Sequence, residues 1–540
     1  MPSSISRGGD VSLFRPLREP LYRALWIATV ASNVGSWMQD VGAAWLMTSI
    51  APSPATVALV RTASSLPIFL LALPAGALAD VVDRRRLLLA TQLWMLVAAA
   101  TLGALTIAGL TTPGVLLAMT FALGLGSALN APAWQAIIPE LVPQSQVTNA
   151  VSLNSTSMNL ARAVGPAIGG LLIGAAGPGI TFLLNAMSFG GVIVVLYRWR
   201  RAPEASVLPT ERVMGAIRAG LRYVRHTPPV RTVLARFAAF ILFGSALWSL
   251  LPAVARFEFN RGPGGYGIML ASFGFGAVSI ATLLPRLRAR TNIDTFLTVA
   301  TLVFAAGLVM LAWVRRYVVA DLAVFGCGAA WISLISTFNS RIQAVAPSWV
   351  RGRALAVSIL VFFGGMSIGS AFWGYIASLW GIPAALTGAA ACTCLGLLAT
   401  RHLRLHGIDR VDLTPSFHWP MPQPASEPQP ERGPVVVTVE YRIDPQHKTE
   451  FMEAMQPVGR IRRRDGAISW TVLGDVADPS RYTEAFVVES WIEHLRQHVR
   501  VTRSDRHILD RARSYHVAPS PPVVTHYLVE PPPEAKRTAR

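Results

Sequence analysis

The amino-acid sequence predicts an all-α polytopic membrane protein of twelve transmembrane helices in two six-helix repeats, followed by a small C-terminal α+β domain. Three observations lead to this fold class. The 540-residue chain is 52% hydrophobic and only 14% charged, with a mean hydropathy of +0.44, whereas soluble domains carry about 25% charged residues. Apolar stretches of membrane-spanning length, about 20 residues each, recur up to residue 405. Arginines gather in alternate loops between those stretches.

The composition excludes several other classes of protein. A chain of soluble domains would need more charge, and a disordered chain would need far less apolar surface. A disulfide framework is excluded because Cys327, Cys392 and Cys394 lie in apolar runs, where they act as small hydrophobic residues. The net charge of +19 does not indicate nucleic-acid binding, because +17 of it belongs to residues 1–430, beside the apolar stretches.

Twelve apolar stretches are candidate membrane spans, because each is long enough to cross the hydrocarbon core as a helix. They are Leu21–Thr48, Thr56–Leu78, Leu87–Ala108, Pro113–Ala131, Val147–Ala176, Ile180–Tyr197, Val233–Val254, Gly265–Leu284, Ile293–Val314, Val318–Ala344, Ala354–Leu379 and Pro383–Leu403.

The distribution of arginine predicts the orientation of these spans. One set of alternate loops contains the runs Arg84–Arg86, Arg198–Arg231, Arg286–Arg290, Arg351–Arg353 and Arg401–Arg410. The opposite set contains only Arg256, Arg261, Arg315 and Arg316. By the positive-inside rule the first set is cytoplasmic, so both termini are predicted in the cytoplasm of a bacterial cell, with the spans in its inner membrane.

An internal repeat divides the spans into two groups of six. VGPAIGGLLIGAAG, from Val164, aligns with IGSAFWGYIASLWG, from Ile368, at an offset that also places Pro143 on Pro347. The fifth and eleventh spans are then equivalent, which is typical of parallel repeats. The predicted organisation is an N-terminal segment (1–20), a first half (21–198), a cytoplasmic central loop (199–231), a second half (232–405), a proline-rich linker (406–433), a soluble domain (434–530) and a disordered tail (531–540).

The soluble domain shows the β-α-β-β-α-β order of the split ferredoxin-like motif. Alternating patterns predict strands, and amphipathic patterns predict helices. The predicted strands are Val435–Ile443, Ile468–Gly474, Arg481–Ser490 and Val523–Glu530, and the predicted helices are Pro445–Arg464 and Trp491–Tyr515.

The loop after the second span reads GALADVVDRRR and resembles the signature of the major facilitator superfamily at this place, roughly G-x-L-A-D-x-x-G-R-R/K. Gly76, Asp80, Arg84 and Arg85 match the signature, and Asp83 replaces its second glycine. The resemblance implies the superfamily's two-half fold and a gating motif. Asp80 would cap the third span or pair with an arginine of the other half, and breaking that pair would let the halves rock.

The fifth span carries ARAVGPAIGG, which resembles the G-P-x-x-G-G signature of the antiporter branch of this superfamily. Gly165, Pro166, Gly169 and Gly170 match. A proline kinks a helix, and glycines let helices pack closely. The resemblance implies export rather than uptake; the alternative is a small-residue packing face without bearing on direction.

Longer segments narrow the resemblance to one branch of the superfamily. WMQDVGAAWLMTS, SLPIFLLALPAGALAD and NAPAWQAIIPELVP resemble transmembrane secretion effectors, the branch that includes enterobactin-exporter-like proteins. In the soluble domain, VVESWIEHLRQH resembles the antibiotic-biosynthesis monooxygenase fold, a dimeric α+β barrel. We expect an accessory or dimerisation module here.

Charges inside apolar spans are functional candidates, because each costs at least about 2.5–3.5 kcal/mol to insert. Asp40 is the only carboxylate well inside a span, and shares a helix face with Asn33 and Trp37. It is predicted to bind a proton or to neutralise a cationic substrate; the alternative is a structural pair with Arg61 or Arg162. Arg162 is expected to hold an anionic substrate group or to organise packing of its span, and Arg61 to extend to the outer surface.

The superfamily resemblance also implies that the first, fourth, seventh and tenth spans line the transport pathway. Together with Asn33, this nominates Trp37, Asn130, Trp248, Trp331 and Asn339 as cavity residues. Tryptophans at such positions are suited to stacking on flat substrates.

The predicted function is secondary active transport: proton-coupled export of a small organic molecule such as a siderophore, drug or secondary metabolite. The chain lacks a Walker P-loop, which argues against an ATP-driven pump. No cofactor and no metal are expected, because the His494/His498 pair has no supporting ligand motif and is better explained as a polar helix face. The alternatives are a bifunctional transporter with a monooxygenase-like or ligand-sensing C-terminal domain, and a transporter-like sensor.

Overall fold

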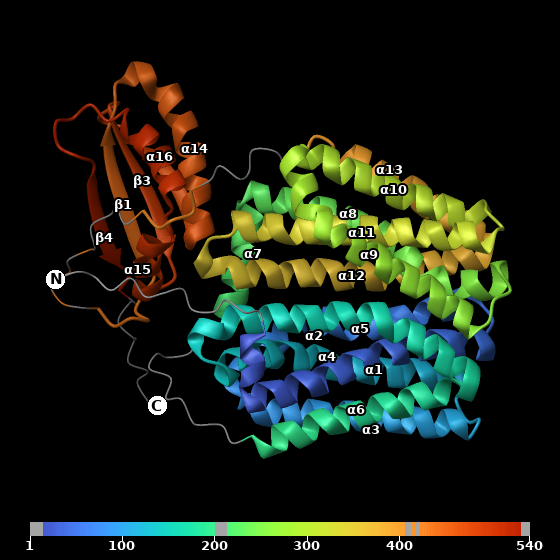
Figure 1. The fold of residues 1–540 in the computed structure, drawn as a ribbon. Helices are drawn as coiled ribbons and strands as arrows, with labels where there is room; N and C mark the ends of the chain where they lie inside the picture. Colours follow the sequence, from blue (N-terminus) through green and yellow to red (C-terminus); the bar gives the residue numbers. More distant parts are fainter. Residues whose placement is uncertain are drawn as a thin grey trace, which may run out of the picture. The chain divides into compact units, whose positions relative to one another are not determined.

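The computed structural model describes residues 14–199, 213–405, 412–416, 422, 424, 426 and 428–530. The predictions for residues 1–13, for most of the linker and for the tail 531–540 fall outside the described residues. The chain divides into two compact units. The first contains most of the long helices, and the second contains a short helix α7, the adjoining ends of α8, α11 and α12, and the C-terminal domain (Figure 1).

Each predicted apolar stretch forms a long helix, often a few residues longer at either end. Within the described residues these helices are α1 (Pro20–Ile50), α2 (Pro54–Val81), α3 (Arg84–Ile107), α4 (Pro113–Leu141), α5 (Val147–Ala176), α6 (Pro178–Arg198), α8 (Pro228–Ala253), α9 (Pro263–Arg290), α10 (Ile293–Trp313), α11 (Tyr317–Val345), α12 (Ser348–Trp380) and α13 (Ile382–Ala399).

Eleven of these helices in the described part of the chain are long and apolar enough to cross a membrane. Helix α1 is not among them, although it has 31 residues. Its polar residues, Asn33, Gln39 and Asp40 among them, lower its hydropathy. The helix that is too polar to count as a candidate span, α1, is therefore the helix that carries Asp40.

The helices of the first unit pack according to the internal repeat. Gly165 of α5 lies against α1, where an added Cβ would be 2.6 Å from Cβ of Trp37, and the repeat-related Gly369 of α12 lies against α8. Both α5 and α12 end at a glycine with positive φ, Gly177 (80°) and Gly381 (84°), a backbone conformation that glycine adopts without strain. Equivalent residues thus make equivalent contacts in the two halves.

Helices α5 and α9, which belong to opposite halves, cross in close backbone contact. A Cβ on Gly170 would lie 2.9 Å from the carbonyl oxygen of Pro263 and 3.0 Å from Cα of Gly267. A Cβ on Gly267 would lie 2.9 Å from the carbonyl oxygen of Pro166. The repeat-related Gly374 of α12 packs on Ala58 of α2. Within the G-P-x-x-G-G segment, Gly170 therefore brings the backbones of opposite halves into contact, whereas Gly165 and Gly169 pack on α1 of the same half.

The second unit contains helix α7 (Val213–His226), in the segment predicted to be only a loop. Tyr223 is fully buried, donates a hydrogen bond to the carbonyl oxygen of Val345 (2.8 Å) and packs edge-on against Trp349 (5.7 Å between ring centroids). Arg222 forms an ion pair with Glu493 of the C-terminal domain, 3.2 Å from Nη2 to Oε1. These contacts explain why a short segment without a spanning apolar run is helical.

The ion pair between Arg222 of α7 and Glu493 belongs to a larger cluster in the C-terminal domain. Glu493 also binds Arg500, whose guanidinium lies 4.6 Å from the ring centroid of Trp349. Burial alone would raise the pKa of Glu493, but the hydrogen bond and charge of Arg500 and the charge of Arg222 lower it below its usual range. Arginine, carboxylate and tryptophan thus form one largely buried cluster.

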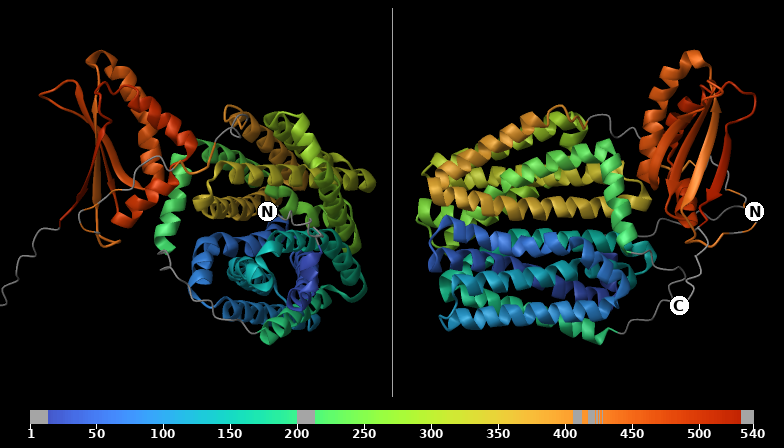
Figure 2. Two further views of the ribbon diagram at one scale, coloured as in Figure 1. Left: turned by 60° about the vertical axis from the view of Figure 1, so that its left-hand side comes forward. Right: turned by 180° about the vertical axis from the view of Figure 1, so that it is seen from behind.

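The C-terminal domain is a four-stranded antiparallel sheet with helices on one face (Figure 2). The sheet order is β2-β3-β1-β4, so each crossover passes over one strand. The elements are β1 (Val435–Arg442), α14 (Lys448–Asp465), β2 (Ala467–Gly474), β3 (Arg481–Val488), α15 (Trp491–Arg500), α16 (Arg503–Arg513) and β4 (Val523–Leu528). All four strands lie where the alternating patterns predicted them.

The single helix predicted over Trp491–Tyr515 is wrong, because the chain forms two helices. It becomes extended at Val501 and Thr502, and Thr502 caps the second helix. The Thr502 hydroxyl accepts a hydrogen bond from the backbone N–H of Asp505, and the Asp505 carboxylate accepts one in return from the N–H of Thr502. This capping box starts a helix at a place where hydrophobic periodicity alone indicates continuity.

A buried ion pair lies under the sheet of this domain. Arg462 donates hydrogen bonds to both carboxylate oxygens of Glu484 (2.8 and 3.1 Å), and the Glu484 side chain is fully buried. Trp470 Nε1 donates to the same carboxylate. Removing one member of such a pair leaves a buried charge without its partner.

We expect Gly170→Val to separate α5 from α9 and to lower the stability of the protein by about 1–3 kcal/mol, because the new side chain collides with backbone atoms. Thermal unfolding in detergent measures the effect. Gly174→Val is the matched control, because a Cβ on Gly174 meets nothing closer than 3.9 Å. Equal melting temperatures for the two variants would contradict the close crossing.

We expect Glu484→Ala to destabilise the C-terminal domain by about 3–5 kcal/mol, because Arg462 is left buried and uncompensated. Glu530→Ala removes the exposed pair with Arg432 and should cost less than about 1 kcal/mol. Limited proteolysis of the full-length protein follows the unfolding of this domain. Similar proteolysis rates for the two variants would show that the buried pair contributes little.

Candidate functional site

The candidate site lies between the two halves and is built around Asp40 of α1. Its carboxylate Oδ2 is 3.6 Å from Nη1 of Arg61 on α2. The Asp40 side chain is 50% exposed and that of Arg61 is 23% exposed, because both line cavities inside the first unit. This distance is too long for a direct hydrogen bond, so the two charged groups are close to each other but loosely held.

Two tryptophans, one from each half, connect this pair to a second arginine. Trp37 of α1 and Trp248 of α8 have ring centroids 6.1 Å apart. The Arg61 guanidinium lies 5.2 Å from the Trp248 ring centroid, and the Arg162 guanidinium lies 5.7 Å from that of Trp37. Cation–π contacts of this kind are worth about 0.5–2 kcal/mol, more when water is excluded.

The charges of this cluster do not balance. Arg61 and Arg162 are close enough for their like charges to interact, and Asp40 is the carboxylate between the halves. Arg162 makes no ion pair within the described residues, and its Nε is buried without a hydrogen-bond partner. The cluster therefore carries one excess positive charge.

Two cavities meet at Asp40. One, of about 230 Å³, extends among α1, α2 and α4, and reaches Phe363 of α12. The other, of about 40 Å³, lies between the halves, and Tyr266 of α9 is among the residues that line it. Trp37, Asp40, Arg61 and Ser64 line both. Aromatic walls with a few charged groups are typical of small-molecule sites.

Contacts between the halves close the end of the bundle where α1 ends and α2 begins. Arg256 donates hydrogen bonds to Ser49 (2.7 Å) and Thr48 (3.3 Å), and stacks over Trp45. Trp45 in turn stacks on Tyr266, with 6.3 Å between ring centroids. Further into the bundle, helices α2 and α12 are joined by a hydrogen bond from Thr62 to the carbonyl oxygen of Ser367 (3.1 Å).

The structure brings some predicted residues together and separates others. Trp37, Asp40, Arg61, Arg162 and Trp248 gather at one place. Arg61 turns inward to Asp40, so its expected extension to the outer surface is wrong; the carboxylate one helix away provides a better partner than the membrane surface.

The remaining cavity candidates make structural contacts. Asn33 donates to Ser157, Asn130 accepts hydrogen bonds from Thr91 and Gln92, and Asn339 accepts one from Ser358. Trp331 is buried among aromatic rings, 5.8 Å from Trp248. Ser64 and Tyr266 line the cavities without having been predicted, because an ordinary serine or tyrosine in a span gives no distinguishing signal.

The loop motif makes contacts within the first half. Arg84 binds Glu140 (2.7 Å), and Arg85 donates to the carbonyl oxygens of Leu196 and Tyr197. Asp83, the residue that departs from the family pattern, caps α3 by accepting from the N–H of Arg86. Asp83 thus occupies the N-cap position of α3. The side chain of Asp80 is outside the described part of the structure, and Gly76 has open space around it.

Two helical halves that enclose a charged, aromatic cavity define a membrane transporter of the major facilitator type. The pattern of the transmembrane secretion effector family matches residues 11–533, and the chain belongs to that family. The match includes the C-terminal domain.

Two relatives are similar to a large part of the chain. The staphyloferrin A transporter of Staphylococcus aureus is 25% identical over 357 residues, which is 65% of this chain and 87% of that protein. The multidrug efflux pump Tap of Mycolicibacterium fortuitum is 27% identical over 410 residues, 73% of this chain and 98% of the pump.

Solved structures share the fold. A bacterial homologue of the human lysosomal transporter Spinster, in an inward-facing conformation, has a TM-score of 0.55 at 15% identity, covering 73% of this chain and 96% of its own. A bacterial homologue of the iron transporter ferroportin, also inward-facing, has a TM-score of 0.56 at 16% identity, covering 71% and 98%.

Proposed function

We propose that this transporter exports a small organic molecule, such as a siderophore, drug or secondary metabolite, in exchange for protons. The observation that carries the proposal is the loosely held Asp40–Arg61 pair in the cavity between the halves. A siderophore transporter and multidrug efflux pumps among the relatives support the class of cargo and the direction. The G-P-x-x-G-G segment at the contact of the halves is consistent with export.

The arginine distribution supports an orientation with both termini in the cytoplasm of a bacterial plasma membrane and α1 as a twelfth span. In that orientation the closed end, with Arg256, Trp45 and Tyr266, faces outward. The described contacts then correspond to a state that receives cargo from the cytoplasm.

Asp40 is the proposed proton site because Arg61 connects it to the opposite half. The Arg61 guanidinium stacks on Trp248, so the chain Asp40–Arg61–Trp248 crosses the interface. A proton on Asp40 removes the charge that holds Arg61 near α1, which weakens this link and favours separation of the halves. Proton binding and rocking are thereby coupled.

Arg162 and the tryptophans are the proposed cargo contacts. The excess positive charge of the cluster favours a cargo that carries an anionic group, and Trp37 offers an aromatic face beside Arg162. The other role considered for Arg162, to organise the packing of α5, predicts no preference for the charge of the cargo.

The C-terminal domain is proposed to be a ferredoxin-like accessory module that joins two copies of the transporter. Its strand order is that of the ferredoxin-like fold, and its helices cover one face of the sheet. The other face presents side chains such as Val436, Val487 and Tyr527, with Tyr527 54% exposed. We propose a structural role rather than the monooxygenase-like activity suggested by its resemblance.

We expect Asp40→Asn to lose pH-driven efflux almost entirely in inverted vesicles, because an amide keeps the shape of the side chain but binds no proton. Asp321→Asn is the matched control: Asp321 also lies in a predicted span, but it accepts a hydrogen bond from Ser272 at the α11 start. Unchanged efflux with Asp40→Asn, or equal loss in both variants, would remove Asp40 from the coupling step.

We expect Arg162→Gln to reduce efflux of carboxylate-bearing compounds about tenfold or more, because the loss of one charge-assisted hydrogen bond is worth about 1.5–3 kcal/mol. Neutral compounds of similar size should leave the cell at the wild-type rate. The comparison uses paired acids and amides in cells that express either protein. An equal reduction for both kinds of compound would indicate that Arg162 organises packing instead.

A further inference from the structure

Helix α7 has an exposed side that combines apolar and basic residues. Arg218, Leu221 and Arg225 are exposed, Leu221 by 47%. They are three and four positions apart, so they are neighbours along one side of the helix. The opposite side is occupied, because Tyr223 is buried against α11 and α12, and Gly220 is buried against α12. Helix α7 thus binds the second unit with one side and exposes the other.

The exposed side carries positive charge that no described carboxylate neutralises. Arg222 has an acidic partner, Glu493. Arg218 and Arg225 form no ion pair within the described residues, nor does the exposed Arg231 in the first turn of α8. The sequence contains no acidic residue from position 212 to position 257. The positive charge of this segment therefore requires an anionic partner from outside it.

A histidine at the end of α7 reports how closely these charges are gathered. The pKa of His226 is lowered, first by its partial burial and then by the charges of four arginines near it. These arginines are Arg225, Arg463, Arg222 and Arg231. Arg463 of α14 stacks on Trp470 and donates to its carbonyl oxygen, so its charge is held without a carboxylate. Helices α7, α8 and α14 therefore meet at a concentration of positive charge.

Helix α7 lies directly before a membrane span. It ends at His226, and α8 begins at Pro228. The helix from Pro228 to Glu258 is among those long and apolar enough to cross a membrane. A basic helix with an exposed apolar residue, separated from a span by a single residue, is placed at the depth of the lipid headgroups.

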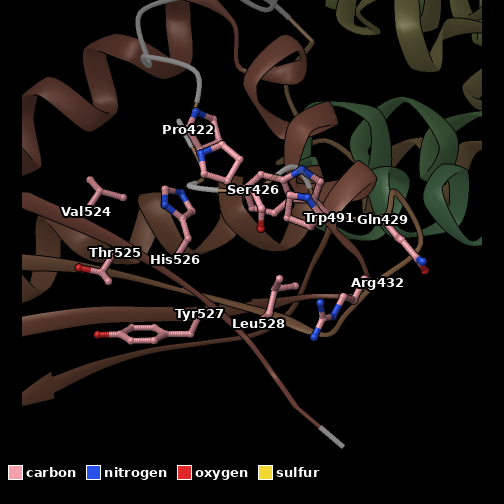
Figure 3. Close-up of a pocket in the computed structure, with 12 residues that line it drawn as sticks. Pro422, Ser426, Gln429, Arg432, Trp491, Val524, Thr525, His526, Tyr527 and Leu528 are labelled. Atoms are coloured by element: carbon pink, nitrogen blue, oxygen red, sulfur yellow. The ribbon is translucent and has the colours of Figure 1, made fainter.

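A cavity of about 680 Å³ beside β4 is another place in the second unit where an anion could bind (Figure 3). Among the described residues, the cationic side chain that lines it is Arg432. Its Nη2 donates hydrogen bonds to both carboxylate oxygens of Glu530, at 2.6 and 2.7 Å. Aromatic residues such as Trp491 and Tyr527 form much of the remaining lining. The charge in this cavity is already neutralised, whereas the charge on α7 is not.

The histidines of α15 do not provide a charged surface either. His494 and His498 are 2% and 8% exposed, so the polar helix face expected from their i, i+4 spacing is wrong, because both side chains are buried in the domain. Burial, together with the neighbouring His526 and His498, lowers the pKa of His494 to about 3. This imidazole is therefore neutral at physiological pH and adds no positive charge.

We propose that the exposed side of α7 rests on the membrane surface and that Arg218, Arg225 and Arg231 bind the phosphate groups of anionic phospholipids. The planar guanidinium group is suited to phosphate, and Leu221 adds an apolar contact at the headgroup boundary. Each arginine near an anionic leaflet strengthens the contact about fivefold. Because Arg222 and Tyr223 of the same helix bind the C-terminal domain and α12, the lipid contact anchors the second unit at the bilayer. Only the choice of the cytoplasmic leaflet rests on the orientation proposed above.

Hydrogen exchange of the full-length protein in nanodiscs tests this contact. The nanodiscs contain phosphatidylcholine alone or phosphatidylcholine mixed with phosphatidylglycerol, and no cargo or proton gradient is present. We expect the backbone amides of α7 to exchange at least about fivefold more slowly in the anionic mixture. High salt should reduce this difference, because it screens the exposed charges. Inorganic phosphate added to the phosphatidylcholine nanodiscs should not reproduce it.

Paired substitutions separate the charge of α7 from the charge of the whole protein. Arg218→Gln/Arg225→Gln should exchange almost equally in both lipids, and Arg218→Lys/Arg225→Lys should keep most of the difference. Arg506→Gln/Arg511→Gln is the matched control, because it removes two exposed arginines from α16 and should behave like the wild type.

Three results would overturn the proposal: equal exchange of the wild type in both lipids, the same slowing in Arg218→Gln/Arg225→Gln, or the same slowing with inorganic phosphate alone. The last would identify a site for a free anion instead of a lipid surface. Both leaflets of a nanodisc have the same composition, so these results do not depend on the orientation of the chain. They are equally independent of Asp40 and of the direction of transport.

Discussion

The electrostatic cost of charge in an apolar interior determines how the centre of this transporter is arranged. Asp40 and Arg61 lie in membrane-part helices, and each reduces the cost of burying the other. Arg61 and Arg162 then spread their remaining charge over the faces of Trp248 and Trp37. The residues of this cluster come from α1, α2 and α5 of one half and from α8 of the other. The electrostatic balance of the cluster therefore depends on how the two halves are placed.

The same constraint explains what could be predicted from the sequence. Apolar length predicts the helices, because the thickness of the bilayer sets the length of a span. The repeat predicts equivalent packing, and Gly177 and Gly381 share a backbone conformation as equivalent residues should. Asp40 and Arg162 stand out because charge is rare in spans. The partner of Arg61 could not be predicted, since the surface and Asp40 are both within reach of a flexible side chain and only the packing of α1 on α2 decides.

Structural elements that depend on contacts between residues far apart in the sequence could not be predicted for a related reason. Helix α7 is stabilised by Tyr223 and Arg222, whose partners follow more than a hundred residues later. The break between α15 and α16 depends on a capping box that interrupts an otherwise continuous pattern. The histidines of α15 have the spacing of an exposed polar face, and their burial follows from the way the helix rests on the sheet. In each case the local pattern allows two outcomes, and tertiary contacts select one.

The discontinuous second unit also has a consequence for biosynthesis. It combines residues 211–233, 340–357 and 405–540. Arg222 is separated from Glu493 by 271 positions along the chain. At about 5–20 residues per second, a ribosome needs roughly 14–54 seconds to make that interval. For that time α7 has left the ribosome while its acidic partner does not yet exist, and most of the second half must enter the membrane meanwhile. The C-terminal domain is thus made after the second half of the membrane part, and it completes a cluster that α7 begins in the middle of the chain.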